Sequence, residues 1–128
     1  NPLDILLIDM PPGIGDEIFD VLRYLPNPEF LVVTTPSRLA HNVVERLLAM
    51  LSELKVSLAG VIENMARPGS DSRAAGLARA YGTELIGSIP FEQGVDDMVR
   101  DAARGKPLPT GLAGGVRPIV ERIAAVKR

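Results

Sequence analysis

Short apolar runs and longer amphipathic segments alternate along the whole chain. The apolar runs contain little polar alternation, which is typical of strands that are covered on both faces in a parallel sheet. We predict strands at about residues 4–9, 30–34, 58–63 and 84–87. We predict helices at about residues 16–25, 37–54, 72–81, 95–103 and 116–127. Strands that alternate with helices indicate an α/β fold, here part of a doubly wound, mainly parallel sheet with flanking helices.

Three helices carry more detailed predictions. Asp16 is predicted to cap the first helix, and the glycine-containing stretch from Gly111 to Gly115 is predicted to form a hinge or turn before the last one. On the long helix at 37–54, the apolar side chains fall into two rows. The first row, predicted to face the core, is Leu39, Val43, Leu47, Met50, Leu51 and Leu54. The second row, which either widens the buried face or forms a contact surface between proteins, is Ala40, Val44 and Leu48.

Composition limits the classes of partner. The chain has 128 residues, 46% of them apolar, which fits one domain with a core of its own. A net charge of −2, no Trp, two Tyr and three Phe argue against a nucleic-acid surface. No apolar run approaches the roughly 18 residues that a membrane span needs. We therefore expect no nucleic acid, no membrane and a cytoplasmic location.

Metal-ligating side chains are scarce. The sequence has no cysteine, and its one histidine, His41, cannot form a zinc or nickel site alone. An acidic group near the predicted helix at 95–103 could suggest a metal site, but acids are also favoured at the start of a helix by its dipole. We interpret this group as solvated; its members are Glu92, Asp96, Asp97 and Asp101.

The most informative stretch is the turn that follows the first predicted strand. Asp9 ends that strand and is followed by Met10, then by Pro-Pro-Gly-Ile-Gly at residues 11–15. Ligands of parallel sheets bind beyond the carboxyl ends of the strands, where a carboxylate can hold Mg²⁺ through water. The amides of Gly13 and Ile14 can face a phosphate, while Pro11 and Pro12 stiffen the turn. The simpler alternative is that Asp9 only caps the turn.

The wording of this segment, LLIDMPPGIGDE, resembles the switch II segment of the Mrp/ApbC family of P-loop ATPases, which are related to MinD and ParA. Ile14 stands where the family usually has threonine. Further matching blocks follow in family order: VTTP at 33–36, GVIENM at 60–65, LIGSIP at 85–90, and Asp101 with GKP at 105–107. The resemblance covers nearly the whole chain. It implies a MinD/ParA-like P-loop NTPase fold.

The resemblance also implies roles for individual residues. Asp9 would orient Mg²⁺ through water, and Gly13 would sense the γ-phosphate of ATP. Asn64 would hydrogen-bond the adenine edge, since an amide offers both a donor and an acceptor; alternatively, it forms a local turn with its own backbone. Pro90, Phe91 and Glu92 would line the base pocket, or else form an ordinary turn between a strand and a helix.

What the sequence lacks qualifies the implied activity. No GxxxxGK[ST] loop occurs, and many family members carry a Cys-x-x-Cys pair that is absent here. We therefore interpret residues 1–128 as the C-terminal half of one P-loop ATPase domain, a Mg²⁺-dependent ATPase when complete and inactive alone.

The implied function is ATP binding and hydrolysis in metal-cofactor assembly of the iron–sulfur type, with no cluster ligands in this chain. The implied partners are the missing N-terminal half, a second copy in a homodimer, and a metal-cofactor client. Alternatives are a MinD/ParA-like or hydrogenase-maturation ATPase, or a non-catalytic scaffold gated by nucleotide. The last apolar residues either dock on the sheet or form a membrane-targeting tail like that of MinD; they are Ile119, Val120, Ile123 and Val126.

Overall fold

A parallel sheet forms the centre of the molecule. The computed structural model describes residues 3–69, 72–107 and 110–125. The sheet has the order β1-β2-β3, and both neighbouring pairs are parallel. Its strands are β1 (Glu29–Thr34), β2 (Ser57–Ala66) and β3 (Leu85–Pro90). The helices are α1 (Asp16–Tyr24), α2 (Arg38–Glu53), α3 (Ala74–Ala80), α4 (Val95–Ala102) and α5 (Thr110–Ala125).

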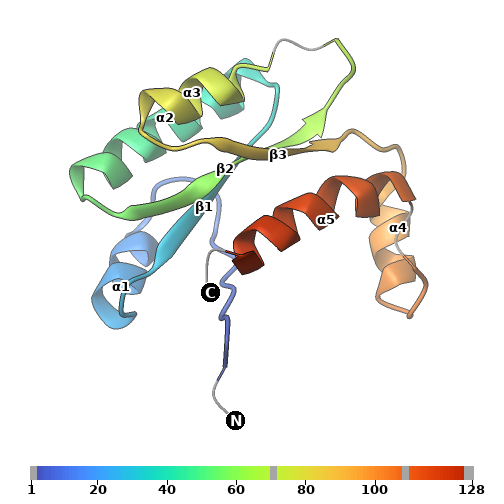
Figure 1. The fold of residues 1–128 in the computed structure, drawn as a ribbon, viewed down its shortest axis with the longest axis horizontal. Helices are drawn as coiled ribbons and strands as arrows, with labels where there is room; N and C mark the ends of the chain where they lie inside the picture. The colour runs from blue at the N-terminus through green and yellow to red at the C-terminus, as the bar shows by residue number, and fades with distance from the viewer. Residues whose placement is uncertain (1–2, 70–71, 108–109, 126–128) are drawn as a thin grey trace.

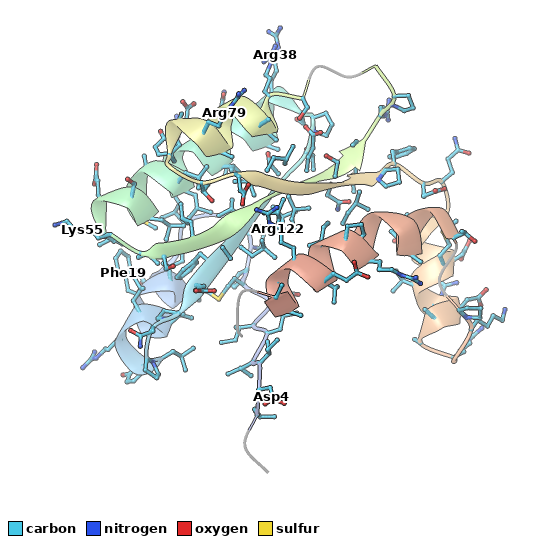
Figure 2. The ribbon with its side chains drawn as sticks, in the orientation of Figure 1. Asp4, Phe19, Arg38, Lys55, Arg79 and Arg122 are labelled. Carbon is cyan, nitrogen blue, oxygen red and sulfur yellow. The ribbon has the colours of Figure 1, made fainter. Side chains whose placement is uncertain are left out.

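Helices cover both faces of this sheet. Figure 1 shows α2 and α3 above the strands and α5 below them. Apolar side chains alternate along the central strand, so that Val61 packs with α2 and α3 while Ile62 packs with Ile119 of α5. Arg122 of α5, labelled in Figure 2, also pairs with Glu84, which lies just before β3. The predicted α/β fold with a parallel sheet and flanking helices is confirmed.

The strand predicted at residues 4–9 does not form. This segment has no regular secondary structure, and Leu7 is 83% exposed. Figure 1 shows it as a trailing segment apart from the three strands, and Asp4 marks it in Figure 2. A strand is stable only where a neighbour satisfies its backbone groups, and none of β1, β2 and β3 pairs with this segment. The apolar pattern of residues 4–9 predicted a buried strand, but the described structure leaves all of this segment exposed.

The buried face of α2 combines residues from both predicted rows. Val44, at 7% exposure, and Leu48, at 0%, lie in the core, whereas Leu39 is 75% exposed. Leu51 of the first row is also fully buried, and Leu47 and Met50 of that row pack against the core, so the second row widens the buried face as one alternative predicted. Packing against β1 sets the rotation of the helix, because both rows have similar apolar character.

The glycine-containing stretch before the last helix is helical, not a turn. α5 begins at Thr110 and includes Gly111 to Gly115. A side chain at Gly115 would place its Cβ 2.9 Å from Pro90, and one at Gly87 of β3 would meet Ile119 at 2.5 Å. The close approach of α5 and β3 thus requires glycine at both positions. A glycine inside a helix lowers helix stability by about 1 kcal/mol relative to alanine, and the packing of α5 on β3 offsets this cost.

Apart from the start of α5, the helices and strands begin and end within a few residues of their predicted positions. Asp16 is the first residue of α1, and Gly15 occupies the cap position with no side-chain hydrogen bond, so the predicted Asp16 cap is wrong. β2 continues through Asn64 to Ala66, beyond its predicted end. Ile119 is buried on the sheet, which confirms docking of the last helix, while Val126 lies outside the described residues.

Candidate functional site

A cavity of about 600 Å³ lies where β2 and β3 end. Its wall combines the end of β2, the loop after β3, the first turns of α4 and one residue of α5. The lining residues are Asn64, Met65, Ile89, Pro90, Phe91, Glu92, Gln93, Gly94, Val95, Asp96, Val99 and Leu112. The structure therefore brings together all four residues that the sequence assigned to the base pocket, Asn64 and Pro90 to Glu92. Carboxyl ends of parallel strands are the usual place for a ligand in this fold class.

The surroundings of Asn64 fit both of its predicted roles, a local turn with its own backbone and a contact with a ligand. Its Oδ1 accepts a hydrogen bond from the Met65 N–H at 2.9 Å, which is a local contact of the turn-forming kind. Its Nδ2 group has no hydrogen-bond partner among the described residues, so two donors remain for a ligand in the cavity. Met65 has a φ of +58°, in the left-handed region that few non-glycine residues adopt. Such backbone conformations cost about 1–3 kcal/mol and cluster at functional sites.

The loop after β3 is tied to the end of β2. The Phe91 N–H donates to the Ala66 carbonyl at 2.8 Å. The guanidinium of Arg67 also lies over the Phe91 ring, 4.7 Å from its centroid. Sequence reasoning missed Arg67, because a cation and an aromatic ring 24 positions apart give no signal until the fold brings them together. These two contacts set the position of the Phe91 side of the cavity.

The acidic side chains near α4 have separate surroundings. Asp97 pairs with Arg100 at 3.2 Å, and Asp101 pairs with Lys106 at 2.9 Å, both on the surface. Within residues 3–69, 72–107 and 110–125, no three ligating side chains gather as a metal site would require. Asp97 and Asp101 therefore take part in surface ion pairs on or next to α4.

The residues assigned to phosphate and magnesium are apart from this cavity. Asp9, Pro11, Pro12 and Gly13 are exposed, and none of them lines the cavity. Gly13 has a φ of +99°, which only glycine adopts readily. Asp9 offers the hard carboxylate oxygen that Mg²⁺ prefers. The structure thus gives the Asp9 turn a glycine-dependent shape, but none of its residues lines the cavity at the ends of β2 and β3.

Sequence reasoning also missed two buried polar residues. Thr34 and Glu63 are 2% and 3% exposed, and they are partners in the register of β1 and β2. Ser88 of β3 is the partner of Glu63 on the other side. The signal in the sequence is a charged residue, Glu63, directly after the apolar residues Val61 and Ile62. These three side chains form a polar row across the sheet near its carboxyl end.

Comparison with known proteins gives consistent matches. A family model described as "ParA: NUBPL iron-transfer P-loop NTPase" matches residues 1–111. An iron-sulfur cluster carrier protein of Mycobacterium leprae is 37% identical, with 70% of this chain and 28% of the relative covered. One of Pseudomonas fragi is 33% identical, with 93% of this chain and 44% of the relative covered. The chain therefore spans less than half the length of either relative.

Among solved structures, the cell division ATPase MinD of Pyrococcus furiosus is similar in fold. The TM-score is 0.57 at 19% sequence identity, and the match covers 77% of this chain and 43% of MinD. At this identity the likeness concerns the fold alone.

Proposed function

Because the chain belongs to the family of NUBPL-type iron-transfer P-loop NTPases within the ParA group, we propose that it forms the adenine-binding and switch portion of an ATPase of iron–sulfur cluster assembly. The observation that carries this proposal is the cavity in which Asn64 meets the loop of Pro90, Phe91 and Glu92. The relatives named iron-sulfur cluster carrier proteins support the choice of pathway. Those relatives are more than twice as long as the part that this chain matches, so they contain further segments that could supply a phosphate-binding loop.

In this proposal the chain contributes two ligand-binding parts. The Nδ2 donors of Asn64 bind ring nitrogens of adenine, and the loop at 90–92 encloses the base. Asp9 would hold Mg²⁺ through water, and the Gly13 amide would meet the γ-phosphate when nucleotide is bound. The bound Mg²⁺ would neutralise charge on the phosphates during hydrolysis. Loss of the γ-phosphate would then relax residues 11–16.

The phosphate cradle and the cluster ligands come from elsewhere in this proposal. The 128 residues contain neither GxxxxGK[ST] nor cysteine, and a cluster is held almost entirely by cysteine thiolates. We therefore propose that a P-loop from an N-terminal half completes the site, and that the cluster is cargo bound by other residues or by a client protein. A homodimer remains a further prediction from the family. No helix in the described part of the chain is long and apolar enough to cross a bilayer.

Base recognition can be tested without the phosphate cradle. Adenosine lacks phosphates, so its binding depends on the cavity alone. Titration of ¹⁵N-labelled chain with adenosine should shift the amide signals of Asn64 and Phe91 to Gly94 and leave those of α1 unchanged. If millimolar adenosine shifts no signal around the cavity, the assignment of the adenine pocket is wrong.

A further inference from the structure

The Arg67–Phe91 pair lies at the edge of the cavity and has two different sides. Phe91 lines the cavity, whereas Arg67 does not. The guanidinium lies 4.7 Å from the ring centroid, within the range of a cation–π contact. Phe91 thus contacts Arg67 and also contributes to the wall of the cavity. Phe91 is 43% exposed, so much of its surface is open to a ligand.

Two contacts hold Phe91 in position, one to its backbone and one to its side chain. The Phe91 N–H donates to the Ala66 carbonyl, which ties the residue to the end of β2. Arg67, the next residue along from Ala66, then covers the side chain. A ring that is held before the ligand arrives loses little conformational entropy on binding, and this favours affinity. An exposed aromatic residue without such contacts would have to be ordered by the ligand itself.

We propose that Phe91 is the surface on which the purine ring of the nucleotide stacks, and that Arg67 is the positioning residue that holds it there. This inference rests on the nucleotide-binding function proposed above. Stacking uses the face of a base, which all bases share, so Phe91 contributes affinity with little selectivity. Asn64 contacts the edge of the base, where adenine and guanine differ, so it contributes selectivity. The two residues therefore have separable effects.

A second pair on the molecule provides a matched control. Arg23 lies over the Tyr24 ring at 5.4 Å from the centroid, on α1. Tyr24 is 69% exposed and does not line the cavity. The two pairs share their chemistry and differ in whether a cavity adjoins the ring.

The first experiment uses fluorescence, because the chain has no tryptophan. Phe91→Trp places a single indole in the cavity wall, and Tyr24→Trp places one on α1. Adenosine should quench the emission of Phe91→Trp in a saturable manner and leave Tyr24→Trp unchanged. Equal responses of the two variants would contradict stacking at Phe91.

The second experiment measures the binding of adenosine and guanosine by amide shifts. Phe91→Leu keeps an apolar side chain but removes the ring, so it should weaken both nucleosides by about 5- to 150-fold. Arg67→Ala should weaken both by about two- to fivefold, and Arg67→Lys should restore binding because an ammonium also makes the contact. Circular dichroism checks that each variant is folded.

The outcomes separate this inference from the proposed function. If the unmodified chain binds no adenosine, both are overturned. If it binds adenosine in the cavity while Phe91→Leu binds equally well, the stacking role is overturned and the adenine pocket stands. A loss for adenosine but not for guanosine would also overturn it, because it would place edge recognition at Phe91.

Discussion

The cavity at the ends of β2 and β3 and the segment at residues 3–15 differ in how many contacts from other parts of the described chain hold them in place. Around the cavity, the Phe91 N–H to Ala66 bond and the Arg67 contact hold the wall in place. In the segment, Leu3 and Leu7 are 78% and 83% exposed, and no strand among the described residues pairs with them. The comparison teaches that contacts between the described strands and loops hold the cavity wall in place, whereas residues 3–15 have few such contacts.

The largest expected effect on stability comes from the core that supports the cavity. Leu48 is fully buried between α2 and the sheet. Leu48→Ala should lower the free energy of unfolding by about 2–5 kcal/mol, because it removes apolar contacts and leaves a void. Urea denaturation followed by circular dichroism measures this. A loss below about 0.5 kcal/mol would place Leu48 on the surface.

The next effect concerns the Asp9 turn and is measured in a protein that also contains a phosphate-binding loop. When the chain is joined to a phosphate-binding loop, Asp9→Asn should lower ATP turnover about ten- to a thousandfold, since one preorganised electrostatic element is lost. Steady-state phosphate release at saturating Mg²⁺ measures this. Asp4→Asn, on the same exposed segment, is the matched control and should retain full turnover. Full turnover in Asp9→Asn would remove Asp9 from the site.

A smaller effect tests selectivity in the cavity. Asn64→Ala should weaken ATP binding by about 1–3 kcal/mol, because ligand atoms lose their hydrogen-bond partner. It should also reduce the preference for ATP over GTP. Calorimetric titration with both nucleotides measures this in the same completed protein. Equal losses for ATP and GTP would favour the local turn, in which the Asn64 Oδ1 accepts from Met65.

The smallest effect on stability is expected at the exposed segment. Leu7→Ser should change the free energy of unfolding by no more than about 0.5 kcal/mol, because the side chain packs against little. It should nevertheless reduce self-association of the 128-residue chain, since exposed apolar side chains and an open strand edge favour pairing. Light scattering at several concentrations measures this. A chain that is monomeric at all of them, with or without Leu7, would contradict the interpretation as half of a domain.

The sequence predicted the elements better than their contacts. Apolar periodicity located β1, β2, β3 and the five helices, and the motifs located Asn64 and Pro90 at one cavity. The apolar pattern of α2 did not show that Leu39 is exposed while Leu48 is buried, because the two side chains are equally apolar and only packing in the fold distinguishes them. It also took Gly111 to Gly115 for a turn, because glycine is a poor helix former in isolation.

The remaining failures also reflect contacts between distant parts of the chain. The need for small residues between α5 and β3 appears only when Gly87 and Gly115 are seen in place. Residues 4–9 have a strand pattern with no strand to pair with among those described. The Arg67–Phe91 contact joins two loops whose proximity depends on the register of β2 and β3.

The extension of β2 past its neighbour has a consequence for solvent access. β1 ends at Thr34, opposite Glu63, while β2 continues to Ala66, where its carbonyl accepts from the Phe91 N–H. That amide proton can exchange with deuterium only when the loop after β3 separates from β2. Its exchange rate therefore measures how often the mouth of the cavity opens in the absence of any ligand, on a timescale of seconds to hours. A slow rate would mean that any ligand of the cavity enters a preformed opening.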